Sequence, residues 1–220
     1  GEYRYYNWIP RDVATPIDPE LIDDGEHPLD ALIHCAGIRG PFGPLTENDP
    51  AQWIQTIQTN LIGTYHAVRA TLTALQKSDD GRILLFSGGG AFGPEPGYSA
   101  YAASKGATVS LMESLAVELV DTTVTVNCVA PGFIATGIHT GTPHEHRPAA
   151  PEAMQNVVAC IRHLLGPASR GLTGRTISAQ FDDWDQIQPW TLPYLGDQGT
   201  RTRHRIEGPN TLMIRHKRAG

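Results

Sequence analysis

The sequence lacks the features that mark membrane-spanning, secreted and nucleic-acid-binding proteins. None of its apolar runs approaches the roughly 20 residues that a transmembrane helix needs, and its first residues do not show the basic-then-apolar order of a signal peptide. The net charge of −6 and the pI near 5.8 give no electrostatic reason to expect nucleic-acid binding. We therefore expect a cytoplasmic protein with no membrane and no nucleic-acid partner.

Cysteine is also scarce. The chain has three, Cys35, Cys128 and Cys160, which are scattered and lie in apolar runs. This distribution is typical of small buried side chains in a reducing compartment, not of a disulfide framework or a metal site. Histidines gather between His139 and His146, but this segment is rich in Pro and Gly and has no regular ligand spacing. We expect no metal there either.

Strand-like and helix-like segments alternate along the 220 residues, and a hydrophobic content of 40% is enough for one domain with a sizeable core. The patterns predict strands at 29–36, 82–87, 124–129 and 175–179, and helices at 50–77, 99–120 and 151–165. This alternation predicts an α/β fold with a parallel sheet, whose ligands bind at the carboxyl ends of the strands. We assign residues 1–180 to this domain and residues 181–220 to an irregular C-terminal extension.

Two of the element starts carry capping signals. Asp18 with Pro19 predicts a short helix over residues 18–25, and Asp49-Pro50 begins the long helix, because an aspartate caps a helix and a proline suits its first position. The segment Tyr3–Ile9 is rich in aromatic residues and has the composition of a strand.

Tyr101 and Lys105 are the strongest candidates for chemistry. They are four residues apart on a predicted helix, so their side chains share one face. An ammonium group near a phenol favours the phenolate, and the tyrosine then becomes a better acid and base near neutral pH. A solvated lysine beside a packed tyrosine is the ordinary alternative for such a pair.

Several motifs surround this pair in a fixed order. They are His34-Cys-Ala-Gly37, Thr59-Asn-Leu-Ile-Gly63, Tyr101 with Lys105, and Pro131-Gly132 with Thr136. On these motifs the chain resembles the short-chain dehydrogenase/reductase family from about Asp12 to Ala179. The resemblance implies a doubly wound, Rossmann-like parallel sheet, which here is truncated or rearranged at its N-terminus. It also implies an NAD(P)-dependent oxidoreductase that interconverts a hydroxyl and a carbonyl on a small-molecule substrate.

The resemblance also implies roles for single residues. Tyr101 gives or takes the proton, Lys105 lowers the pKa of that tyrosine and holds the ribose hydroxyls, and Asn60 helps to position a water relay to the lysine. For Asn60 we keep the alternative of a polar side chain that is satisfied inside its helix. The cofactor is expected against Asp12, Val13, Cys35, Ala36, Gly37, Tyr101, Lys105, Pro131, Gly132, Ile134 and Thr136.

One catalytic position departs from the family. The family has a serine thirteen residues before the tyrosine, and that position is Gly88 here, while Ser87 lies one residue early. Losing such a donor typically lowers the rate by roughly a hundredfold to a thousandfold. Ser87, displaced by one position, is therefore the candidate for the fourth catalytic residue. A catalytically degenerate subunit, with a structural role beside an intact homologue, is the alternative function.

The N-terminal part departs further. Family members begin with a strand, a Gly-x-x-x-Gly-x-Gly turn, a helix and a second strand, and only about 36 residues precede Gly37 here. Three explanations stay open: the chain is a fragment, Tyr3–Ile9 fills the vacant place in the sheet, or a partner chain fills it. Without this turn the sequence does not choose between NAD and NADP.

The run Gly88-Gly-Gly90-Ala-Phe-Gly93 is not a substitute for the missing turn, because Pro94 and Pro96 prevent a helix from following it directly. We interpret it as a flexible loop over the substrate. In the family the two long helices, here 50–77 and 99–120, pack against a second subunit. We therefore expect a homodimer or homotetramer.

Overall fold

Four parallel strands form one sheet in this computed structural model, which describes residues 11–23, 25 and 27–187. The strands are β1 (Ala31–His34), β2 (Arg82–Phe86), β3 (Thr125–Ala130) and β4 (Thr176–Ser178), and they lie in the order β1-β2-β3-β4. His34 pairs with Leu85, and Phe86 pairs with Val129. The carboxyl ends of neighbouring strands are therefore level, and the loops that follow them meet at one edge of the sheet.

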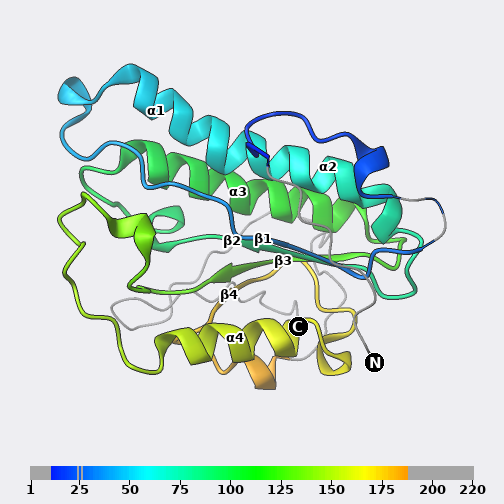
Figure 1. Cartoon of the computed structure of the whole chain (residues 1–220). Coiled ribbons are helices and arrows are strands. Elements are labelled where there is room, and N and C mark those ends of the chain that lie inside the picture. The colour runs from blue at the N-terminus through cyan, green and yellow to red at the C-terminus, as the bar shows by residue number, and fades with distance from the viewer. Residues whose placement is uncertain (1–10, 24, 26, 188–220) are drawn as a thin grey trace, which may run out of the picture.

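Helices cover both faces of the sheet (Figure 1). Those on one face are α1 (Pro50–Ile57), α2 (Gly63–Leu75) and α3 (Ser99–Glu118), and α4 (Ala153–Leu164) lies on the other. Helices on both faces of a parallel sheet define the doubly wound, Rossmann-like architecture. The predicted fold class is confirmed.

The alternation of side chains along β2 explains this layering. Ile83 and Leu85 are buried in a cluster with residues of α2 and α3, whereas Leu84 between them is buried in a second cluster with residues of α4. Successive strand residues point to opposite faces, so a continuous apolar run supplies two cores at once.

Both predicted caps are present. The Asp49 side chain accepts a hydrogen bond from the Ala51 backbone N–H at the start of α1, and Asp18 accepts one from Glu20. The helix after Asp18 is only a short 3-10 turn, Pro19–Leu21, and does not extend to residue 25. The predicted long helix is interrupted by a π-helical turn, Gln58–Ile62, which separates α1 from α2.

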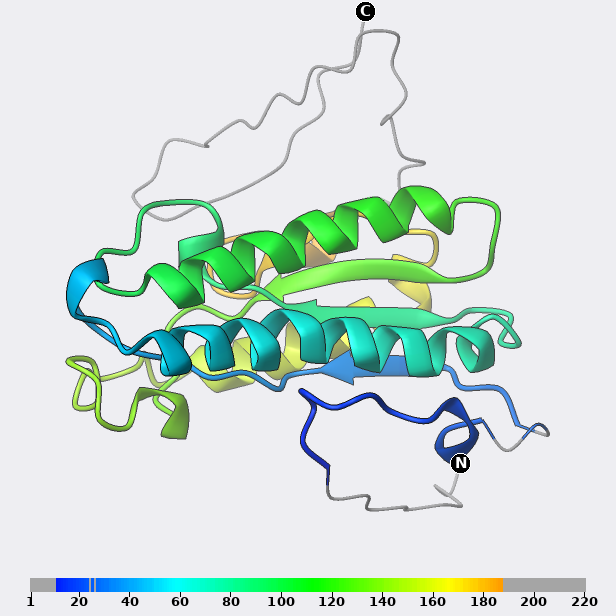
Figure 2. The same cartoon turned by 90° about the horizontal axis from the view of Figure 1, so that it is seen from above.

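β1 is shorter and more exposed than predicted. The expectation was a buried strand over residues 29–36, but the strand is Ala31–His34 and Ile33 is 43% exposed. In the described part of the chain β1 pairs with β2 alone and forms an edge of the sheet, as the view from above shows (Figure 2). The segment Tyr3–Ile9 lies outside the described residues, so the three explanations for the missing N-terminal strands stay open.

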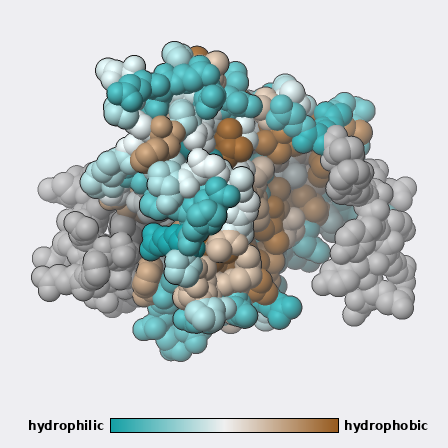
Figure 3. All heavy atoms as spheres, turned by 60° about the vertical axis from the view of Figure 1, so that its left-hand side comes forward, coloured by the Kyte–Doolittle hydropathy of each residue, from teal (hydrophilic) through white to brown (hydrophobic). Residues whose placement is uncertain are grey.

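The surface carries exposed apolar side chains as well. Figure 3 shows hydrophobic residues gathered in one area of the surface. Large exposed apolar side chains include Ile33 on β1, Ile54 on α1 and Tyr65 on α2. Among the described residues we find no helix with both the length and the apolar character that a membrane crossing requires.

The cysteine prediction is correct for two residues and wrong for one. Cys128 and Cys160 are free and buried, but Cys35 is exposed, because it follows β1 at the edge of the sheet. Of the proposed C-terminal extension, Trp184 and Ile187 pack against the cluster beside α4. Residues 188–220 lie outside the described part, so the domain boundary near residue 180 stays a prediction.

Candidate active site

A cavity of about 1130 Å³ opens at the carboxyl ends of the strands. Its lining includes nine of the residues that the sequence predicts for the site: Cys35, Gly37, Ser87, Tyr101, Lys105, Pro131, Gly132, Ile134 and Thr136. These residues come from the segments after β1, β2 and β3 and from the start of α3. The topology thus brings four separate stretches of sequence to one place.

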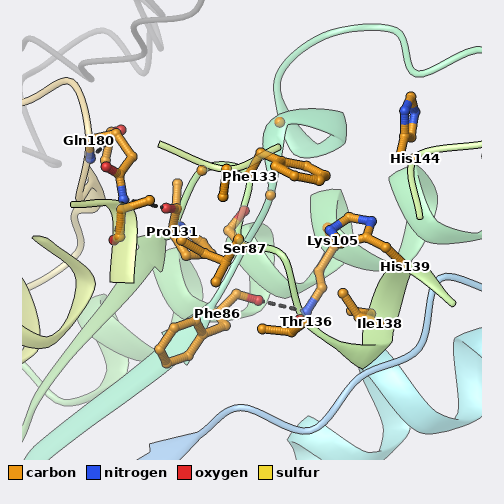
Figure 4. A pocket seen from close by; sticks show the side chains of 18 of the residues that line it. Phe86, Ser87, Lys105, Pro131, Phe133, Thr136, Ile138, His139, His144 and Gln180 are labelled. Atoms are coloured by element: carbon orange, nitrogen blue, oxygen red, sulfur yellow. Dashed lines mark hydrogen bonds between the residues drawn. The ribbon is translucent and has the colours of Figure 1, made fainter. Parts of the chain in front are cut away.

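Lys105 is buried and is held by the sheet. Its Nζ donates a hydrogen bond to the Phe86 carbonyl oxygen at the end of β2, over 2.8 Å (Figure 4). Burial lowers the pKa of Lys105 to about 8. The amine therefore loses its proton close to the pH range in which many enzymes work.

Tyr101 lies one turn before Lys105 on α3 and is also buried, at 8% exposure. Its pKa is raised, mainly because burial disfavours the phenolate, while the charge of Arg39 opposes this rise and that of Glu95 adds to it. The expectation that Lys105 lowers the pKa of Tyr101 is therefore not met in this structure. The reason is geometric, since the Lys105 Nζ is bound to Phe86 and lies 5.8 Å from the centroid of the Tyr101 ring.

Asn60 is not among the residues that line the cavity, but it connects two segments that contribute to the lining. It lies in the π-helical turn, where its Oδ1 accepts a hydrogen bond from the Ile38 N–H (2.8 Å). Its Nδ2 donates to the Ile38 carbonyl (2.9 Å) and to Ser104 Oγ (2.9 Å). Ser104 Oγ in turn donates to the Tyr101 carbonyl oxygen. Asn60 thus ties the loop after β1 to the first turns of α3.

Gly88 lies directly against the tyrosine. A Cβ atom at this position would be 3.1 Å from the Tyr101 hydroxyl oxygen, closer than most real Cβ contacts. A serine at residue 88 would therefore need the tyrosine to shift. Ser87, the other candidate, lines the cavity and is 2% exposed, and its hydroxyl has no hydrogen-bond partner in the described part of the chain.

The turn after β3 is clamped by a residue that sequence reasoning missed. Gly132 has a positive φ of 75°, and a Cβ there would be 2.6 Å from Gln180 Cγ. Gln180 Nε2 donates to the carbonyl oxygens of Pro131 (2.8 Å) and Ala153 (2.9 Å) (Figure 4). The signal that points to Gln180 is its place just after β4, at a strand carboxyl end.

Two more missed residues approach Tyr101. Arg39 follows Gly37 by two positions, and its guanidinium forms a 2.7 Å ion pair with Glu95. Arg39 and Glu95 both line the cavity.

Three residues that the sequence predicted at the cofactor, Asp12, Val13 and Ala36, are not among the residues that line the cavity. Val13 instead packs against the start of α2, where a Cβ at Gly63 would be 3.0 Å from the Val13 side chain.

The histidine-rich segment contributes His139 and His144 to the cavity lining. His139 is buried and its ring lies 4.5 Å from that of Phe133, while His144 stacks 6.1 Å from the ring of Tyr98. In the described ranges no three His, Cys, Asp or Glu side chains are grouped as metal ligands. The rings of Phe133, His139 and His144 all line the cavity.

Comparison with known proteins gives consistent results. The sequence model of the short chain dehydrogenase family matches residues 20–147. The protein named uncharacterized oxidoreductase YciK from Escherichia coli K12 is 32% identical over 152 residues, which cover 69% of this chain and 60% of YciK. The chain thus spans less than two thirds of the length of this relative.

Solved structures agree with the fold. A short chain dehydrogenase from Salmonella enterica serovar Typhi CT18 superposes with a TM-score of 0.71 at 30% identity, covering 79% of this chain and 74% of that one. A short chain dehydrogenase from Escherichia coli CFT073, complexed with NADPH, has a TM-score of 0.66 at 31% identity, with coverage of 74% and 67%. Because the family model matches more than half of the residues, this chain belongs to the short-chain dehydrogenase family.

Proposed function

We propose that this protein is an NAD(P)-dependent oxidoreductase that interconverts a hydroxyl and a carbonyl group on a small molecule. The observation that carries the proposal is the pair Tyr101 and Lys105, buried side by side on α3 and both lining a cavity at the strand carboxyl ends. The name of YciK and the NADPH in the Escherichia coli CFT073 structure support this proposal.

The cavity suits the nicotinamide half of the cofactor. Gly37 and Lys105 both line it, and a Cβ at Gly37 would lie 3.2 Å from Asn60 Oδ1 and 3.5 Å from Lys105 Nζ, so a side chain there would crowd the amine that is expected to hold the ribose hydroxyls. The Pro131–Gly132 backbone also lines the cavity and is fixed by Gln180. The pyrophosphate half would need the Gly-rich turn, which the sequence before Gly37 does not contain.

A nicotinamide ring accepts or supplies the hydride when the cofactor is bound. The side chains of this chain manage the proton. During oxidation the Tyr101 phenolate takes the proton of the substrate hydroxyl as its carbon loses a hydride, and during reduction the Tyr101 hydroxyl returns a proton to the new alkoxide oxygen.

Titration with NADH and NADPH, followed by nicotinamide fluorescence and calorimetry, tests the proposal. We expect one of the two to bind, and Lys105→Met to weaken that binding at least about tenfold because it removes a charged hydrogen-bond donor. Lys77→Met is the control, since Lys77 pairs with Asp23 and is not a cavity residue. A chain of verified full length that binds neither nucleotide would falsify the proposal.

A structural subunit is the second candidate, favoured by Gly88 at the position where the family has its serine. Co-purification with a full-length homologue, together with no turnover by the isolated chain, would support it. For the enzyme we propose in addition a homodimer or homotetramer in the cytoplasm.

A further inference from the structure

The guanidinium of Arg39 lies between two tyrosine rings. Its Cζ is 3.9 Å from the ring centroid of Tyr98 and 4.7 Å from that of Tyr101. The Arg39 side chain is only 10% exposed. A cation with so little water around it acts strongly on neighbouring groups, because the local dielectric is low.

Glu95 holds Arg39 in this place. The Arg39 Nη2 donates to the Glu95 carboxylate over 2.7 Å, and Glu95 is 25% exposed. Residue 39 follows β1 and residue 95 follows β2, so the pair joins two loops that are 56 residues apart in the sequence. The Arg39 Nε is buried and has no hydrogen-bond partner among the described residues, so the guanidinium is not fully engaged by the protein.

The other groups expected to act on the Tyr101 hydroxyl are absent or occupied. Gly88 brings no side chain to the hydroxyl. Lys105 Nζ is 5.8 Å from the Tyr101 ring centroid and is bound to the Phe86 carbonyl. The Arg39 guanidinium is therefore nearer to the Tyr101 ring than the Lys105 ammonium is.

We propose that Arg39 is a positioning residue that stabilises the ionised form of Tyr101, the role that the resemblance gives to Lys105, and that Glu95 limits this effect. The inference rests on the proposed function only in taking Tyr101 as the proton carrier. Among the described residues, the charged groups around the phenol include Arg39 and Glu95 on the two loops and Lys105 on α3. The opposing effects of Arg39 and Glu95 on the pKa of Tyr101 agree with the geometry.

Titration of Tyr101 by NMR tests the proposal without substrate or cofactor. The full chain is labelled with carbon-13 at the tyrosine Cζ, and Tyr101 is assigned among the seven tyrosines from the signal that Tyr101→Phe removes. We expect Arg39→Met to lower the ionisation constant of Tyr101 about tenfold or more, since an opposite charge at this range shifts a pKa by ~1 unit or more. Glu95→Gln should raise the ionisation constant of Tyr101. Arg39→Lys keeps the positive charge, so its ionisation constant should lie between those of Arg39→Met and wild type.

Arg147→Met is the matched control. Arg147 also lines the cavity, but its guanidinium lies over Phe133, 4.6 Å from that ring, so its removal should leave the Tyr101 titration nearly unchanged. An unchanged Tyr101 titration in folded Arg39→Met protein overturns the proposal. If Arg39→Met does not fold, Glu95→Gln provides the test. A Tyr101 titration in Glu95→Gln that is identical to wild type then overturns the proposal. Failure of nucleotide binding would instead count against the proposed function alone.

Discussion

The buried imidazole of His34 makes the stability of this fold depend on pH. It ends β1 at 8% exposure, and burial, with a smaller effect of the Lys105 charge, lowers its pKa from 6.5 to about 4. In the unfolded chain His34 binds a proton below pH 6.5, whereas in the folded protein it stays neutral down to about pH 4. The contribution of neutral His34 is thus fully present above pH 6.5 and is lost as the pH falls from there to about 4.

Replacing this ring should remove that pH dependence. For His34→Asn we expect the loss of free energy of unfolding between pH 7 and pH 4 to be smaller than in wild type by on the order of 3 kcal/mol. Urea denaturation followed by circular dichroism at both pH values measures it. His146→Asn, at an exposed position, is the control, and equal pH dependence in wild type and His34→Asn would contradict the assignment.

Gly132 should not tolerate a side chain. Its φ of 75° and the Gln180 Cγ atom 2.6 Å from the Cβ position make Gly132→Ala unfavourable on two grounds. We expect a loss of about 2 kcal/mol or more in the free energy of unfolding. Gly137→Ala is the matched control, because a Cβ there meets nothing within 4 Å. Equal urea midpoints for the two variants would show that this turn is not clamped.

At this scale the sequence predicts residues that belong to motifs and misses those defined by long-range contacts. Tyr101 and Lys105 follow from their spacing on one helix. Arg39 and Gln180 act through partners 56 and 49 residues away, Glu95 and Pro131, and no local pattern marks such pairs. The direction of the Tyr101 pKa was missed for the same reason, since burial raises it and the charge of Arg39, distant in sequence, opposes that rise.

The π-helical turn Gln58–Ile62 is the element that most affects the site. It places Asn60 so that all its amide contacts go to the loop after β1 and to Ser104 on α3. π-Helical turns are rare in proteins, and those that do occur are often found at functional sites. The sequence predicted one continuous helix here, because the apolar periodicity continues through the turn.

Asn60→Asp keeps the shape of the side chain but removes both donated hydrogen bonds. A carboxylate would then face the Ile38 carbonyl at a fully buried position, and we expect a loss of at least about 2 kcal/mol in the free energy of unfolding. Urea unfolding measures the effect. Gln58→Glu, exposed in the same turn, is the control. Wild-type stability in Asn60→Asp would show that this network does not hold the loop.

For the whole molecule the exposed faces of α1 and α2 lead to a prediction about assembly. Ile54 is 53% exposed and Tyr65 is 44% exposed. If these helices form the expected homodimer or homotetramer contact, Ile54→Arg should shift the mass from light scattering toward the monomer, because a charge is costly in an apolar interface. Gln55→Arg, at the neighbouring exposed position, is the control. A wild-type monomer at micromolar concentration would contradict the prediction.

The order of the strands in the sheet is also their order in the chain, β1-β2-β3-β4. Each strand can therefore dock on one that the ribosome has already released, so the sheet can grow in step with translation. The clamp on the Pro131–Gly132 turn comes last, since Gln180 follows β4. A nascent chain that ends before this glutamine would carry the tyrosine and the lysine but would not yet have a finished wall for a nucleotide to rest against.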